Sequence, residues 1–245
     1  MGKNAYIQRV RNDKRNKMKN IPIVILNRDR LHPLVEQITS LKSKGYNNIT
    51  VIDNQSTYPP LLEWYARNEV DVFHNDITEN SCHAFRDLVQ QGHPKFVNIT
   101  SDWFVFNDSD IIPLDDVPDN FIEDLKNYAI KYNKSKVGMS IKIDDLDMSY
   151  PLNEWVHKYE STYWTNAIVD NGVELYPHPI DTTFSIHAPG TLPTWSSDTL
   201  RVGVPYVVKH LPFYYNPEAL PEDEKYYLEH MNKQSSNWSS KVEIK

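Results

Sequence analysis

The sequence predicts an α/β fold with a mostly parallel central sheet and helices on both faces. One observation is a series of short apolar runs, as expected for strands buried on both faces. A second is that segments with apolar residues at helical spacing separate these runs, which is the pattern of β-α-β units. The apolar runs are residues 21–26, 48–53, 70–73 and 103–106, and the helical segments are residues 31–44, 61–65, 84–91 and 121–132.

The first strand and helix have the clearest signals. Residues 21–26 are continuously apolar and rich in β-branched side chains, which favours a buried strand. The following helix carries an apolar stripe, and Gly45 is a plausible end because glycine often follows the last helical turn. The stripe consists of Leu34, Val35, Ile38 and Leu41.

The next elements alternate in the same way. The second strand ends at Asp53, and a helix begins with Leu61 and Leu62 after two prolines. A third strand, a helix over 84–91 and two further strands over 95–97 and 103–106 follow. The helix over 121–132 then has its apolar residues at helical spacing, namely Phe121, Leu125, Ala129 and Tyr132.

The second half of the chain differs in composition. From Ser140 onward it is rich in Tyr, Trp, Pro and His, with short strands predicted at 183–186 and 206–208 and a last helix at 222–231. No linker separates two independent units. We therefore predict a basic N-terminal extension (1–20), one domain (21–232) with halves at 21–115 and 116–232, and a flexible tail (233–245).

The charge is unevenly distributed. The net charge is −7, yet residues 1–20 contain seven Lys or Arg against one Asp. An acidic body argues against nucleic acid as the main partner. The basic segment 1–20 could make a peripheral contact with anionic membrane lipids.

Cysteine content and hydropathy predict a cytoplasmic protein. Cys82 is the single cysteine, so no internal disulfide can form and a reducing compartment fits. The basic leader lacks the apolar segment of a secretion signal. No apolar run approaches the roughly 18–20 residues of a membrane span.

Asp108 and Asp110 follow a buried strand and are separated by one residue. In an extended chain such side chains point the same way. Two carboxylates at a strand end suit Mg²⁺ or Mn²⁺ shared with a diphosphate, and in open α/β sheets ligands bind at this edge. The alternative is that Asp-Ser-Asp forms a turn.

Six features occur in a fixed order along residues 21–213, and together they resemble the GT-A class of nucleotide-sugar glycosyltransferases. The resemblance is to the family-two-like bacterial and viral enzymes that build surface polysaccharides and glycans. It implies a GT-A fold, Rossmann-like over 21–115, with a loop-rich acceptor half over 116–232. The features are Asn27-Arg28-Asp29, Asp53 at a strand end, the segment 79–87 with Arg86, Asp108-Ser-Asp110, Asp181-Thr-Thr, and Lys209-His210-Leu-Pro-Phe213.

The resemblance implies a nucleoside-diphosphate sugar as donor, with a UDP-sugar favoured, and a glycan as acceptor. The residues assigned to the nucleotide are Asn27, Arg28, Asp53, Arg86 and Asp108. The family usually has an Asp-Asp pair where this chain has Asp53-Asn54. The alternatives are that Asp53 opens a turn and that Arg86 pairs with a carboxylate such as Asp87.

The resemblance also implies a Mn²⁺ or Mg²⁺ cofactor, held by Asp108, Asp110 and His210. A core or surface histidine is the alternative for His210. No spacing of the histidines with Cys82 suits a zinc site.

Asp181 is the candidate general base in an inverting transfer, because a sugar hydroxyl needs a carboxylate within reach of its proton. Asp198 is a competing candidate, and the pair Asp144-Asp145 is a third. Asp181 could instead cap the segment that follows it.

Trp155, Trp164 and Trp195 are candidate acceptor-binding residues, since aromatic faces stack on sugar rings. Ordinary core packing is the alternative for each.

Two other functional classes fit the sequence less well. A sugar nucleotidyltransferase needs a glycine-rich phosphate loop after its first strand, and Asn27-Arg-Asp-Arg30 has no glycine. A non-catalytic carbohydrate-binding module would not need Asp53, Arg86 and the Asp-x-Asp motif together.

Overall fold

The computed structural model describes residues 19–67, 70–78, 83–181, 183–231 and 241. Most of the predicted N-terminal extension (1–20), nearly all of the predicted tail (233–245) and residues 79–82 of the segment before Arg86 lie outside the described residues.

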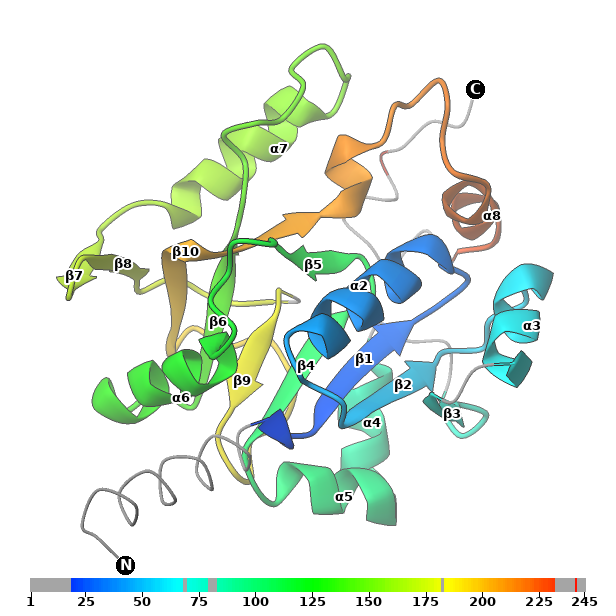
Figure 1. Cartoon of the computed structure of the whole chain (residues 1–245), viewed down its shortest axis with the longest axis horizontal. Helices are drawn as coiled ribbons and strands as arrows, with labels where there is room; N and C mark the ends of the chain where they lie inside the picture. Colours follow the sequence, from blue (N-terminus) through cyan, green and yellow to red (C-terminus); the bar gives the residue numbers. More distant parts are fainter. Residues whose placement is uncertain (1–18, 68–69, 79–82, 182, 232–240, 242–245) are drawn as a thin grey trace, which may run out of the picture.

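A mixed sheet forms the centre of the described part of the chain (Figure 1), with the strand order β3-β2-β1-β4-β9-β6-β10-β8-β7 and β5 beside β10. The strands are β1 (Ile23–Asn27), β2 (Ile49–Asp53), β3 (Asp71–His74), β4 (Phe104–Asp108), β5 (Ile111–Pro113), β6 (Lys136–Ile141), β7 (Ile168–Asp170), β8 (Val173–Tyr176), β9 (Ser185–His187) and β10 (Thr199–His210).

The α/β class is confirmed, but the sheet is mixed rather than mostly parallel. Strands β1 to β4 are parallel neighbours, and so are β6 and β10. Strands β5, β7, β8 and β9 make antiparallel pairs. Strands β7, β8 and β9 belong to the loop-rich half of the chain, where hairpins and returning segments replace the crossover helices that parallel strands require. Strand β5 directly follows the turn after β4 and pairs with β10 of that half.

Helices cover both faces of the sheet, as predicted. Side chains alternate along β1, so that Ile23 and Ile25 join one core cluster and Val24 and Leu26 join the other. The first cluster includes residues of α2 (His32–Ser43), α3 (Pro59–Arg67) and α6 (Phe121–Lys131). The second includes residues of α4 (Ala84–Gln90) and α5 (Pro94–Thr100).

The sequence predicts the end of α2 correctly but assigns residues 95–97 to the wrong kind of element. Gly45 has φ 85°, and Tyr46 N donates to Leu41 O at 3.0 Å, so the glycine end of α2 is confirmed. The predicted strand at 95–97 is wrong, because these residues lie in α5 with Pro94 in its first turn. A short apolar run fits either element, and a helix buries Phe96 here.

The second half extends the same sheet. The strand predicted at 183–186 is shifted to β9, and residues 206–208 belong to the longer β10. Helices α7 (Asn153–Glu160) and α8 (Glu222–His230), with the 3₁₀ helices η1 (Ser161–Tyr163) and η2 (Leu211–Tyr214), complete this half. Because one sheet spans both halves, they do not form separate layers.

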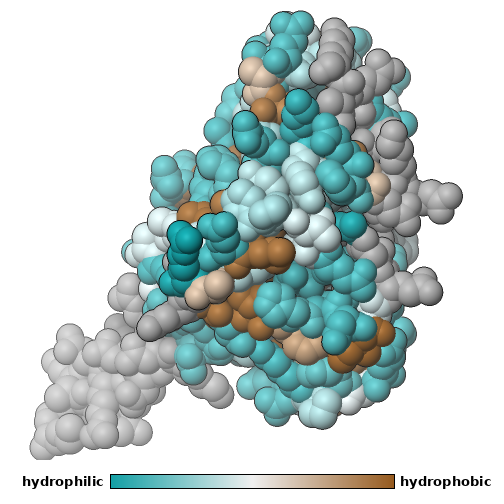
Figure 2. All heavy atoms as spheres, turned by 90° about the vertical axis from the view of Figure 1, so that its right-hand side faces the viewer, coloured by the Kyte–Doolittle hydropathy of each residue, from teal (hydrophilic) through white to brown (hydrophobic). Residues whose placement is uncertain are grey.

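The outer surface is mostly hydrophilic on the side of α3 and α8, with smaller hydrophobic areas (Figure 2). None of the helices in the described ranges has the length and apolar character needed to cross a membrane.

The strand order creates a topological switch point at one edge of the sheet. From β1 the chain steps through β2 to β3 on one side, and β4 then lies on the other side of β1. The carboxyl ends of β1 and β4 flank this switch point, which is the place where open α/β sheets bind ligands.

Candidate functional site

Several polar side chains end neighbouring strands at this carboxyl edge. Asn27, Asp53 and His74 are register partners at the ends of β1, β2 and β3. Asp108 is the last residue of β4. The parallel register thus brings two of the predicted nucleotide-binding residues, Asn27 and Asp53, side by side and sets Asp108 on the next strand.

The chain turns immediately after Asp108. Ser109 N donates to Leu26 O at 3.0 Å, and the Gln37 amide of α2 donates to Asp108 O at 3.0 Å. Asp110 is therefore in a turn, and its buried carboxylate pairs with Arg30 in the loop after β1. The expected extended segment is wrong and the turn alternative is confirmed for the backbone, while metal binding by the two carboxylates stays a prediction.

His210 reaches Asp110 through the pairing of β5 with β10. The register sets His210 opposite Ile111, the residue after Asp110, and Leu211 N donates to Asp110 O at 2.9 Å. His210 Nε2 then lies 3.3 Å from Asp110 Oδ2. Its Nδ1 is buried and has no hydrogen-bond partner among the residues that the structure describes.

Arg30 is a site residue that sequence reasoning missed. Its NH1 lies 2.9 Å from Asp110 Oδ2, and its Nε and NH2 donate to the two carboxylate oxygens of Glu224 at 2.6 and 2.9 Å. The guanidinium also lies over the ring of Tyr227, 3.7 Å from its centroid. The available signal was its place in the loop after the first strand, at the predicted ligand edge.

Electrostatics keep this buried cluster charged. Burial alone would raise the pKa of Asp110, but the charges of Arg30 and His210 outweigh it and hold that pKa well below its usual range. Burial also opposes the charge of Arg30, and Glu224 and Asp110 reverse this effect and raise its pKa. At neutral pH Asp110 and Arg30 are therefore both ionised.

The donor set at Asp110 and His210 fits a divalent cation. A carboxylate and an imidazole side by side suit Mn²⁺, with Mg²⁺ preferring oxygen alone. Within the described ranges no group of three or more His, Cys, Asp or Glu side chains comes together to hold a metal ion. The protein would thus supply two ligands here, and diphosphate oxygens and water would supply the rest.

Side chains of α3 and β3 contact the Asp53 carboxylate. Its buried carboxylate accepts from Tyr65 OH at 3.4 Å and lies 3.2 Å from His74 Nδ1. The Asn27 amide donates to the same Tyr65 oxygen at 2.9 Å. Tyr65 therefore couples the strand ends of β1 and β2, and Asp53 is the last residue of a strand rather than only the start of a turn.

Two predicted nucleotide-binding arginines have partners away from Asp110. Arg28 contacts Asp29 at 3.4 Å and donates to His230 O at 3.2 Å. Arg86 donates through Nε and NH2 to Asp87 Oδ1 at 2.9 and 2.7 Å. The pairing with Asp87 is the alternative that the sequence had left open for Arg86.

Asp181 lies beside a buried lysine. The Nζ of Lys136 donates to the carbonyls of Ile180 at 3.0 Å, Asp181 at 2.8 Å and Thr194 at 3.2 Å. Burial lowers the pKa of Lys136 to about 8, while the charges of Asp181 and Asp108 oppose this shift. Both carboxylates therefore act on one ammonium group, and the exposed Asp181 side chain belongs to the same electrostatic neighbourhood as Asp108.

Asp198 stays an open alternative to Asp181 as the base, because the bridge between Ile180 and Ser196 sets its segment beside that of Asp181. Asp198 immediately precedes β10, whereas His210 ends that 12-residue strand, and it pairs with Lys134 before β6. Asp144 and Asp145 follow β6 and share Lys142, and Tyr214 OH donates to Asp145 at 2.7 Å.

The three predicted acceptor tryptophans are not equivalent. Trp155 on α7 is 39% exposed and stacks on Tyr159 with a centroid separation of 5.4 Å. Trp164 packs against the core and meets the Tyr176 ring at 5.3 Å, so the core alternative holds for it. Trp195 is 56% exposed in the segment that leads into β10.

Comparison of the sequence with models of known protein families and with curated proteins finds no match.

Proposed function

We propose that this protein is a metal-dependent glycosyltransferase, which moves a sugar from a nucleoside-diphosphate sugar, a UDP-sugar in the first instance, to a hydroxyl of a glycan. The observation that carries the proposal is the meeting of Asp110 with His210 beyond the carboxyl end of β4. A carboxylate and an imidazole from distant parts of the chain converge there, at the same edge of the sheet as the end of β2 that carries Asp53.

In this proposal Asp110 and His210 hold Mn²⁺ or Mg²⁺, with Asp108 at the edge of the same site. The cation neutralises the charge that grows on the diphosphate as it leaves. Asp53 and Asn27 bind the nucleoside, since they end the neighbouring strands β2 and β1, and β1 adjoins the strand β4 that carries Asp108.

Asp181 is the proposed base of a single displacement with inversion. As the acceptor oxygen bonds to the anomeric carbon, the bond from that carbon to the diphosphate oxygen breaks, and the acceptor proton moves to the Asp181 carboxylate. Its exposure and its shared electrostatic neighbourhood with Asp108 support this role.

The test is hydrolysis of a panel of nucleotide sugars with added Mn²⁺, comparing the wild type with Asp110→Asn. We expect hydrolysis of one donor class by the wild type, its loss in EDTA and its loss in the variant. Asp102→Asn is a matched control, because it changes an exposed carboxylate just before the opposite end of β4. Hydrolysis that persists unchanged in EDTA and in Asp110→Asn would contradict the metal role.

A further inference from the structure

We propose that Arg30 is a further diphosphate-binding residue, which Asp110 and Glu224 hold in the free protein and which exchanges Asp110 for the diphosphate when cation and donor bind. This inference rests on the proposed function. It adds an interaction that the strand-end carboxylates do not provide, namely a cationic side chain beside the leaving group.

Two side chains crowd one carboxylate oxygen of Asp110. Asp110 Oδ2 lies 2.9 Å from Arg30 NH1 and 3.3 Å from His210 Nε2. A cation that binds Asp110 and His210 needs the lone pair of Nε2 and the charge of this carboxylate. The metal cation therefore takes the place of the Arg30 guanidinium beside this oxygen, because two positive charges compete for one carboxylate.

Two carboxylates hold the Arg30 guanidinium. Nε and NH2 form a two-pronged contact with Glu224, while NH1 points to Asp110. If Asp110 binds the cation, NH1 loses its acceptor, but Glu224 and the Tyr227 ring still hold the group at the site. The planar guanidinium then matches the oxygens of a diphosphate bound to the same cation.

The buried charge of Arg30 requires an acceptor in every state of the site. Arg30 is buried, and an unpaired buried cation is strongly unfavourable. Exchange of a carboxylate for a phosphate keeps Arg30 paired in both states. A purely structural arginine would have no second acceptor to exchange.

The experiment measures Mn²⁺ binding by electron paramagnetic resonance, with Mn²⁺ alone, with inorganic pyrophosphate and with UDP. The main variant is the double change Arg30→Gln with Glu224→Gln, which leaves no stranded carboxylate at residue 224. We expect Mn²⁺ alone to bind about three- to tenfold more tightly, because the competitor is gone. Pyrophosphate and UDP should bind the Mn²⁺-loaded protein on the order of 10- to 100-fold more weakly, since a charge-assisted contact is lost.

Arg30→Lys and Asp53→Asn complete the design, with circular dichroism to confirm that each variant is folded. Lysine keeps the charge without the fork, so its loss of pyrophosphate affinity should be smaller than that of the glutamine variant. Asp53→Asn should weaken UDP and leave pyrophosphate unchanged, because its contact is with the nucleoside.

The opposite signs expected for Mn²⁺ and for pyrophosphate separate a binding role from a structural one. If both affinities fall together, or neither changes, the exchange is overturned while the proposed function stands. If the wild type binds neither Mn²⁺ with pyrophosphate nor Mn²⁺ with UDP, the proposed function fails as well.

Discussion

Asp110 and His210 each depend on neighbours that lie far away in the sequence. Asp110 stays ionised in a buried position because Arg30 and His210 contact one of its oxygens. A buried carboxylate without such partners would take up a proton instead. The charge that suits a cation site is therefore a property of the cluster and not of Asp110 alone.

At the residue scale, Asp181→Asn should lower sugar transfer by roughly 10²–10⁴-fold, the usual contribution of a general base. Donor affinity should change little, because the hydrogen bond from Lys136 goes to the Asp181 backbone carbonyl, which the substitution retains. Kinetics with saturating acceptor measure the effect, and Asp198→Asn tests the competing base candidate in the same assay. Loss of donor binding in Asp181→Asn would point to a structural role, and retention of the anomeric configuration would exclude a single displacement.

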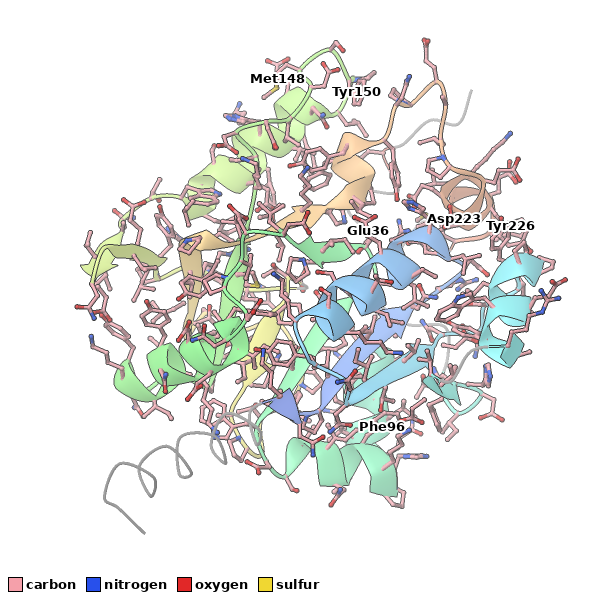
Figure 3. All side chains as sticks on the ribbon, viewed as in Figure 1. Glu36, Phe96, Met148, Tyr150, Asp223 and Tyr226 are labelled. Carbon is pink, nitrogen blue, oxygen red and sulfur yellow. The ribbon has the colours of Figure 1, made fainter. Side chains whose placement is uncertain are left out.

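Helix α8 contacts the start of α2, the segment before α3 and Arg30. Asp223 accepts from Leu31 N and His32 N at 2.9 and 2.7 Å at the start of α2. Tyr226 OH donates to Thr57 Oγ1 at 3.1 Å before α3, and both side chains face these helices from α8 (Figure 3). Since Glu224 holds Arg30, α8 links two helix starts to the site.

At the element scale, Asp223→Ala should lower the free energy of unfolding by about 1–2 kcal/mol, because α2 loses the side chain that caps its first turn. Urea denaturation measures this difference. Glu222→Ala is the matched control, since Glu222 is an exposed acidic residue in the same turn of α8. Equal stability of the two variants would show that the cap contributes nothing measurable.

In the whole molecule, Lys136 holds together the segments before and after β9. It begins β6, and its Nζ binds carbonyls on both sides of β9, at Ile180 and at Thr194. Gly138 allows the same close packing, because a Cβ there would lie 2.9 Å from Phe184 O. This packing fixes the segment that presents Asp181.

At this scale the pKa of Lys136 predicts a pH dependence. Its folded value of about 8 lies below the ordinary 10.5, so between these values the unfolded chain binds a proton that the folded chain does not. Stability from this group is therefore lowest below about pH 8 and rises towards pH 10.5, by at most on the order of 3 kcal/mol.

Comparison of the wild type with Lys136→Met isolates this contribution, because the other titrating groups are common to both proteins. The unfolding free energy of the wild type minus that of the variant should increase from pH 8 to pH 10.5 in denaturant titrations. A difference that stays constant or decreases would contradict the lowered pKa.

The sequence by itself determined the first half of the fold and the strand-end residues. Continuous apolar runs and helical stripes identify β1, β2, α2 and α6, because burial and periodicity act locally. Asp53, Asp108 and Asp110 follow from their positions at the ends of such runs. The same local reasoning failed at residues 95–97, where a short apolar run fits a strand and a helix equally well.

Only the tertiary structure decided which polar residues meet. Arg30 contacts Glu224 at a sequence separation of 194 residues, and no local pattern records such a pairing. The meeting of His210 with Asp110 likewise depends on the pairing of β10 with β5, which no local pattern records. Strand direction and register arise from contacts across the whole sheet, and this is the physical reason why the sequence could propose the site residues but not assemble them.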